Sequence, residues 1–276
     1  AKIKAQTEQG GAGIGSGLYG GSSDVNIRGG TVVAEGYYTG IGGHYSDSDT
    51  SGTTETSTIE ISGGTVYAKG DGSTTGGDGV SNGSTGRNSN ITISGNAKVK
   101  NTGRMGSHAS YYVKDKGISS TITIKDNAMI ADGSGAIGGD TNTNITIQDN
   151  AVIGNLLKIG PRYNEWSGYI GTCTGTSDRI YNAKATVQIK DNVLIKDVTF
   201  IGGKYITSDV KIKIQDNAHI KKIACGSMYP NTPAIGSDYG KVDVTIGGSS
   251  DPNTQQQGTV RIDYAEQNGG YCTVIG

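Results

Sequence analysis

The strongest constraint on this chain is a pair of apolar residues, six positions apart, that recurs along its length. Between the two members of each pair stands a short polar segment containing Gly-Gly, Gly-Asn or Asp-Asn. The seven pairs are Ile27/Val33, Ile61/Tyr67, Ile93/Val99, Ile124/Ile130, Ile147/Ile153, Ile189/Ile195 and Ile214/Ile220. Such a pattern predicts two short strands joined by a two-residue corner. Because one such edge cannot bury its apolar side alone, successive coils must stack on one another.

A second recurrent feature, an apolar residue followed by glycine, predicts a third strand in every coil, and we call it the apolar-glycine landmark. It occurs at Ile14, Ile41, Met105, Ile137, Ile159 and Ile201, and Val80 takes the same place with serine after it. Two positions leave the register open, since Ile170-Gly171 and Ile235-Gly236 could replace Ile159-Gly160 and Cys225-Gly226. No segment has the pattern of a helix of three turns or more, so we expect an all-β fold.

The composition fits a narrow stacked core better than a broad globular one. Hydrophobic residues make up 33% of the chain and glycines number 47, which suits a solenoid with glycine at its corners. The repeat runs throughout, so we expect one domain over residues 1–276. The chain opens and closes within the pattern, at Ala1 and Gly276, and we expect it to be a fragment that continues into further domains of a larger protein.

Charge and hydropathy limit the possible partners. The net charge of −1 argues against nucleic-acid binding. The sequence contains no run of 18 apolar residues, so insertion into a membrane is not expected. Three distant cysteines, Cys173, Cys225 and Cys272, allow at most one disulfide, and thiols are the favoured interpretation.

Asparagine occupies the same corner position in five coils, and we expect it to adopt left-handed backbone angles there. Stacked side chains of these residues could also hydrogen-bond from coil to coil as an asparagine ladder; they are Asn96, Asn127, Asn150, Asn192 and Asn217. With this ladder the chain resembles the right-handed parallel β-helices. Segments such as 11–15 and 59–66 resemble repeats of large secreted or surface proteins of Gram-positive anaerobic bacteria. The resemblance implies about eight three-strand coils with inserted loops, and an extracellular or cell-surface location.

Long insertions carry the candidate ligand-binding residues. The longest stretches between landmarks are 42–58, 106–120 and 160–186, which predicts loops on every second coil. Rings that project from a rigid scaffold suit the stacking of sugars, although tyrosines at repeated positions could instead pack within a corner. The ligand-binding candidates are Trp166, Tyr163, Arg162, Tyr111, Tyr112, Tyr45 and His44.

Acidic residues give weaker indications. Asp47 and Asp49 alternate with hydroxyl residues and could bind Ca²⁺, although a solvated polar loop is the favoured interpretation and no other cofactor is expected. Asp126 and its equivalents recur in four coils just before the ladder asparagine. A residue repeated in this way is expected to be structural. No nucleophile motif or carboxylate pair is recognisable, so we do not expect an enzyme.

These features favour a non-catalytic extracellular binding or adhesion module that recognises a polysaccharide or a host glycoprotein through its loops. This function rests on analogy with the fold. A host-protein adhesin, for example one that binds an immunoglobulin or a receptor, and a structural stalk are the alternatives. A polysaccharide lyase or hydrolase is the least favoured.

Overall fold

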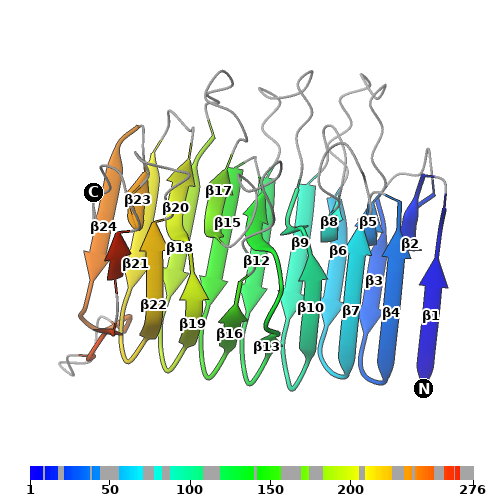
Figure 1. Ribbon diagram of the computed structural model, residues 1–276, viewed down its shortest axis with the longest axis horizontal. Helices are drawn as coiled ribbons and strands as arrows, with labels where there is room; N and C mark the ends of the chain where they lie inside the picture. Colours follow the sequence, from blue (N-terminus) through cyan, green and yellow to red (C-terminus); the bar gives the residue numbers. More distant parts are fainter. Residues whose placement is uncertain are drawn as a thin grey trace.

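The computed structural model describes residues 1–8, 10–17, 22–37, 39–43, 56–70, 78–82, 88–107, 119–139, 142–156, 169–173, 183–204, 209–225, 233–237, 240–251, 258–263 and 265–267. These residues form an all-β structure in which every strand pairing is parallel. The strands build three sheets, and the chain visits them in the same order in every coil (Figure 1). We call these sheets A, B and C.

Sheet A contains the strands that come directly after the two-residue corner predicted from the sequence, which we call the tight corner. Its inward residues include Val66, Val99 and Ile130, which pair in register. Its strands stack in the order of the chain, and β25 and β26 both pair with β22. They are β1 (Lys2–Gln6), β4 (Thr31–Gly36), β7 (Thr65–Gly70), β10 (Lys98–Thr102), β13 (Met129–Ile130), β16 (Val152–Asn155), β19 (Leu194–Val198), β22 (His219–Cys225), β25 (Arg261–Ile262) and β26 (Ala265–Gln267).

Sheet B contains the apolar-glycine landmarks. Its strands are β2 (Ala12–Gly15), β5 (Thr39–Gly43), β8 (Asp78–Asn82), β11 (Arg104–Met105), β14 (Ala136–Gly139), β17 (Tyr169–Cys173), β20 (Phe200–Lys204) and β23 (Ile235–Ser237). Ile137, Ile170 and Ile201 lie in register on neighbouring strands and are fully buried. The glycines that follow them also pair with one another.

Sheet C precedes the tight corner and shows the cleanest alternation between buried and exposed residues, as in β21, where Lys211 and Lys213 are exposed. Its strands are β3 (Asp24–Ile27), β6 (Thr56–Ile61), β9 (Asn88–Ile93), β12 (Ser119–Ile124), β15 (Asn142–Ile147), β18 (Ala185–Ile189), β21 (Val210–Ile214) and β24 (Val242–Ile246). The inward side chains of the three sheets meet in one core, which consists mainly of isoleucine, valine and alanine.

The tight corner corrects our expectation about asparagine. In four coils the left-handed residue is the aspartate, with φ between 56° and 60°, and not the asparagine that follows it. The aspartate at this position also links neighbouring coils. Oδ2 of Asp149 accepts a hydrogen bond from the backbone N–H of Asp126 in the preceding coil at 3.0 Å. The same bond recurs from Gly95 to Asp126, from Asp149 to Asp191 and from Asp191 to Asp216. The structural role predicted for these aspartates is confirmed.

The asparagine ladder is also present, and it runs along the solvent-exposed side of the corner. Side-chain amides of successive coils donate to the next amide oxygen over 3.2–3.5 Å, from Asn217 through Asn192, Asn150 and Asn127 to Asn96. The residue after the asparagine points inward, as the fully buried Ala128 and Ala151 show.

The first two corners are one residue shorter than the sequence spacing suggested. Val32 and Val66 occupy the inward position, and Val33 and Tyr67, which we expected there, lie half-buried on the outer face. Gly30 and Gly64 supply the positive φ of these shorter corners, 85° and 84°. The six-residue spacing therefore holds for five of the seven pairs.

The register left open in sheet B is also settled. Ile170, and not Ile159, pairs with Ile137 and Ile201, and Ile235 pairs with Ile201. Long connections from sheet B to sheet C nevertheless occur in alternate coils, namely 44–55 after β5, 106–118 after β11 and 174–184 after β17. The connections between them, after β8 and β14, are short.

Candidate functional site

All of the loop residues proposed from the sequence lie outside the described residues. These are Trp166, Tyr163, Arg162, Tyr111, Tyr112, Tyr45 and His44, together with the calcium candidates Asp47 and Asp49. Within the described ranges, no group of three or more His, Cys, Asp or Glu side chains is placed to hold a metal ion. The loop sites therefore remain predictions.

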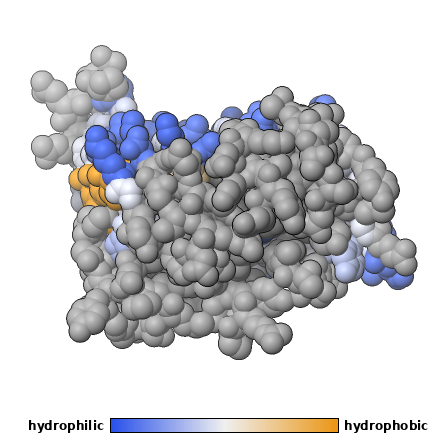
Figure 2. Space-filling view, turned by 90° about the horizontal axis from the view of Figure 1, so that it is seen from above, coloured by the Kyte–Doolittle hydropathy of each residue, from blue (hydrophilic) through white to orange (hydrophobic). Residues whose placement is uncertain are grey.

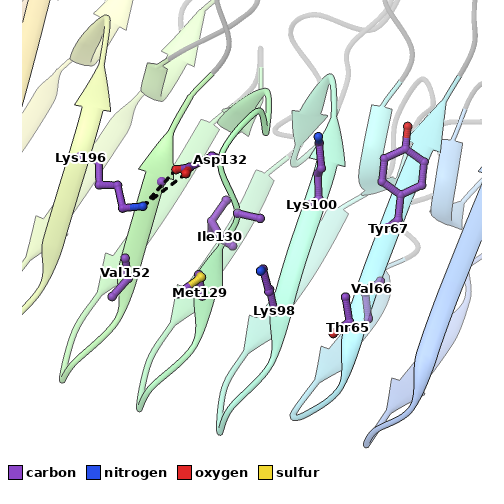
Figure 3. Close-up of a pocket in the computed structure, with 12 residues that line it drawn as sticks. Thr65, Val66, Tyr67, Lys98, Lys100, Met129, Ile130, Asp132, Val152 and Lys196 are labelled. Atoms are coloured by element: carbon purple, nitrogen blue, oxygen red, sulfur yellow. Dashed lines mark hydrogen bonds and ion pairs between the residues drawn. The ribbon is translucent and has the colours of Figure 1, made fainter.

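The structure instead shows a groove on the outer face of sheet A. It encloses about 500 Å³ and extends over strands β7, β10, β13, β16 and β19 (Figure 3). Apolar side chains from successive coils contribute to its surface, among them Tyr67, Met129 and Val152. Three lysines, Lys98, Lys100 and Lys196, line it against a single carboxylate, that of Asp132. Among its described lining residues, cationic groups thus outnumber anionic ones.

The groove exists because the chain leaves the sheet after the short strand β13. The N–H of Ala131 donates to the carbonyl of Val99, and the N–H of Gly135 donates to the carbonyl of Asn101. The chain therefore advances four residues, from 131 to 135, while β10 advances only two. The extra residues form a turn that bends toward β16, where the N–H of Gly133 donates to the carbonyl of Asn155 at 2.9 Å. This turn leaves the outer surface beside Lys100 open.

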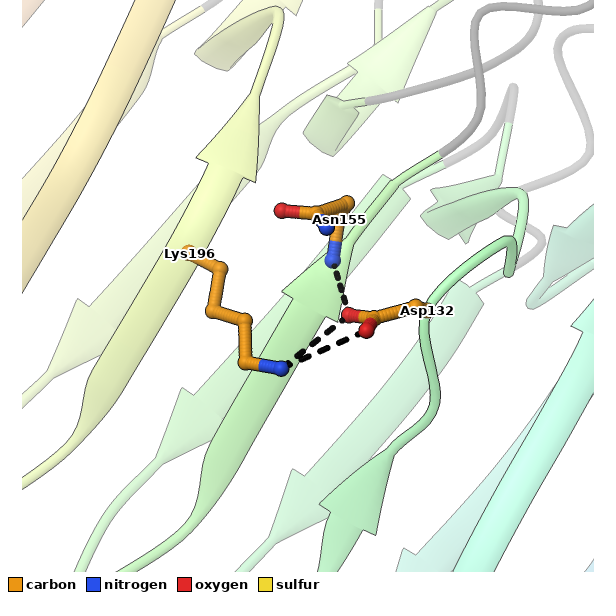
Figure 4. A network of polar contacts seen from close by, with 3 residues as sticks. All are labelled: Asp132, Asn155 and Lys196. Atoms are coloured by element: carbon orange, nitrogen blue, oxygen red, sulfur yellow. Dashed lines mark hydrogen bonds and ion pairs between the residues drawn. The ribbon is translucent and has the colours of Figure 1, made fainter.

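Asp132 fixes the turn against the neighbouring coils (Figure 4). Its Oδ1 accepts a hydrogen bond from the backbone N–H of Asn155 at 2.8 Å, and Nζ of Lys196 lies 3.3 Å from both carboxylate oxygens. The Asn155 N–H is the largest influence that lowers the pKa of Asp132, and Lys196 and Lys98 lower it further. The carboxylate is therefore ionised and already paired on one wall of the groove.

Gly154 provides the room for this arrangement. A Cβ at this position would lie 2.5 Å from Oδ1 of Asp132 and 2.6 Å from its backbone nitrogen. Only a residue without a side chain lets the turn approach β16 this closely.

The lysines on β10 differ from Lys196. Lys98 is exposed and Lys100 is half-buried, and both point to the outer face, two residues apart. Among the described residues, no hydrogen bond or ion pair reaches the amino group of either one, although the charge of Lys98 contributes to the lowered pKa of Asp132. Lys100 pairs across the strands with Tyr67, so the two side chains project from neighbouring positions of the same face.

Sequence reasoning missed this groove because its residues are ordinary members of the repeat. The available signal was the Asp132-Gly133-Ser134-Gly135 segment, which has turn composition but lies between two expected strands. A second signal is Gly154 in the next coil, because this glycine has no role in a corner.

A second polar cluster lies on the outer face of sheet A near β25. Nε2 of His219 lies 2.7 Å from Oδ2 of Asp263, and Arg261 contacts the other oxygen of the same carboxylate. The hydrogen bond with His219 is the main influence that lowers the pKa of Asp263. This cluster ties β25 to β22.

The remaining surface adds little of one chemical kind. On the face shown in Figure 2, the described atoms are mainly hydrophilic, with one hydrophobic group at the end where β24 lies in Figure 1. In the described part of the chain, no helix has the length and hydropathy to span a membrane.

Comparisons with known proteins do not extend this picture. No protein-family model matches the chain, and no curated protein or solved structure is significantly similar to it.

Proposed function

We propose that the chain is a right-handed parallel β-helix of about eight coils that serves as a non-catalytic binding or adhesion module of a secreted or cell-surface bacterial protein. Its ligand is a polysaccharide or a glycoprotein. The observation that carries this proposal is the open groove on sheet A, in which Tyr67 and apolar side chains lie beside two lysines, Lys98 and Lys100, that form no ion pair with any described residue.

The chemistry of the groove favours binding over catalysis. Glycoside hydrolysis usually requires two carboxyl groups that flank the scissile bond. Asp132 is the single carboxylate among the described groove residues, and it is held by Lys196 and Asn155. Sugar recognition needs less, namely an apolar ring surface with polar groups at its edge.

The long connections support the same proposal in a second way. Residues 44–55, 106–118 and 174–184 all leave sheet B and return to sheet C, so their ends are anchored on the same side of alternate coils. Binding residues often lie on loops that a rigid scaffold positions. Trp166, Tyr163 and Arg162 belong in the sequence to a different connection, the one between β16 and β17.

A glycan array, run beside a pull-down from host secretions, tests the function. We expect retention on polysaccharides, and a loss of retention in the Tyr67→Ala or the Trp166→Ala variant according to which surface binds. A blank array together with one captured protein, in a complex insensitive to added sugars, would favour the host-protein adhesin. No ligand in either experiment would leave the structural stalk.

A further inference from the structure

We propose that the groove on sheet A binds an anionic polysaccharide, with Lys98 and Lys100 contacting its carboxylate or sulfate groups and Tyr67 contacting a sugar ring. This inference rests on the proposed binding function and assigns it a site and a ligand class.

The direction of the groove favours a polymer. Its lining residues come from five successive strands of sheet A, which lie side by side (Figure 1), so a ligand that follows the groove crosses the strands. Neighbouring strands are about 4.8 Å apart, and five strands therefore span roughly 19 Å. A chain of several sugar units fits this length, whereas a single monosaccharide would occupy only part of it.

The two lysines select negative charge. Their side chains rise from alternate positions of β10, which places their attachment points about 6.7 Å apart on one face (Figure 3). No described side chain forms a hydrogen bond or ion pair with either amino group, in contrast to Lys196, whose amino group contacts both oxygens of Asp132. An ammonium group that makes no ion pair with a described residue can bind an anion from solution.

The apolar part of the groove favours a sugar over a purely ionic ligand. Tyr67 lies directly across from Lys100, and Thr65 lies across from Lys98. Met129 and Val152 extend the apolar surface on the other side of β10. A pyranose that carries an acidic group presents the same combination, an apolar ring face with a charge at its edge.

Asp132 gives the site a polarity. Its carboxylate bonds to the Asn155 N–H at the end of β16 and to Lys196 on β19, and it would repel an anionic group placed beside it. The acidic groups of the ligand therefore lie toward β10, and its neutral hydroxyl groups face Asp132 and Lys196.

The test compares retention by three polymers in affinity electrophoresis at low salt, with dextran sulfate, hyaluronan and neutral dextran as probes. Dextran and dextran sulfate share a backbone, and hyaluronan supplies carboxylates in place of sulfates. The variant is Lys98→Gln/Lys100→Gln, and the matched control is Lys211→Gln/Lys213→Gln. The control removes the same charge from exposed, equally spaced positions on the outer face of sheet C. Far-UV circular dichroism checks that both variants fold.

We expect the wild-type chain to be retained by at least one anionic probe and much less by neutral dextran. The Lys98→Gln/Lys100→Gln variant should lose at least tenfold in apparent affinity, and the control variant less than threefold. Tyr67→Ala should also weaken retention, while Tyr67→Phe should preserve most of it. Retention by dextran sulfate alone identifies sulfate as the ligand group, and retention by hyaluronan identifies carboxylate.

Four results would overturn the inference. Equal losses in the two lysine variants would show unspecific attraction to charge, and a preference for neutral dextran or other neutral glycans would leave the binding function intact but refute the ligand class. Capture of an acidic protein or a nucleic acid through the same lysines, without retention by any polysaccharide, would assign the groove to another kind of partner. Absence of every ligand would also refute the proposed function.

Discussion

The glycines that follow most landmark residues of sheet B offer the sharpest test of this architecture. Gly138 has φ +129°, and a Cβ added there would lie 1.8 Å from the carbonyl oxygen of Gly171 in the next coil. The same relation repeats from Gly171 to Gly202 and from Gly202 to Gly236. We therefore expect Gly138→Ala to be strongly destabilising.

The magnitude follows from two contributions. A side chain in this backbone region costs about 1–3 kcal/mol. To relieve the clash, β14 and β17 must separate, which weakens their parallel hydrogen bonds at about 1 kcal/mol each and the contact of Ile137 with Ile170. We expect a loss of about 4 kcal/mol, against a total stability on the order of 5–15 kcal/mol.

Urea unfolding followed by far-UV circular dichroism measures the effect, and hydrogen exchange of the β14 and β17 amides localises it. Gly29→Ala is the matched control, because no atom lies within 4 Å of the added Cβ and its φ is not in the left-handed region. The control should change the stability by less than about 0.5 kcal/mol. If the two variants unfold at the same urea concentration, the argument that successive glycines lie too close for a side chain would be refuted.

Three further predictions concern the corner and the groove. Asp149→Ala should lower the free energy of unfolding by about 2–3 kcal/mol through the lost hydrogen bond to the Asp126 amide. In the same urea unfolding experiment, Asp149→Asn, and Asn150→Ala in the exposed ladder, should each cost about 1 kcal/mol or less. Equal losses in the three variants would contradict the roles of the aspartate and the asparagine. Gly154→Ala should displace the Asp132 turn and cost about 1–3 kcal/mol, and chemical-shift changes at residues 131–135 would verify the displacement. Burial raises the pKa of Asp216, but hydrogen bonds from Ser250 and Asp191 lower it by more. The ionised carboxylate therefore stabilises the folded chain fully above the unfolded pKa of about 4, and this contribution is lost as the pH falls further. The difference in stability between wild type and Asp216→Asn should therefore shrink in urea titrations below that pH, and a constant difference would refute the assignment.

The sequence predicted the framework well because each coil repeats the same physical requirements. An inward isoleucine, a polar corner and an apolar-glycine pair recur, and they specify three strands per coil. The spacing could not reveal that the first two corners are shorter, since Val32 and Val33 are both β-branched and either could face inward. It also could not choose between Ile159 and Ile170, because both are followed by glycine and both leave acceptable connections. Pairing with Ile137 and Ile201 decides that choice.

The candidate site was predictable to a much smaller degree. Aromatic residues in long insertions attract notice because they depart from the repeat, and the structure does not describe them. The groove, by contrast, is made of residues that any coil could carry, such as Lys98 and Met129. Its shape comes from the turn at Asp132, whose effect depends on the absence of a side chain at Gly154 in the next coil. Such a dependence between coils cannot be read from one repeat alone.

The position of the groove has a physical reason. A regular stack presents the same outer surface in every coil, and a row of strands at constant spacing offers no hollow in which a ligand could be partly enclosed. A local departure from the repeat is needed, and β13 provides it by ending after two residues. The departure is tolerated because Asp132 replaces the lost pairing with its own bonds to Asn155 and Lys196. We therefore expect recognition in this chain to lie where the periodicity is interrupted and the backbone hydrogen bonds are satisfied by side chains.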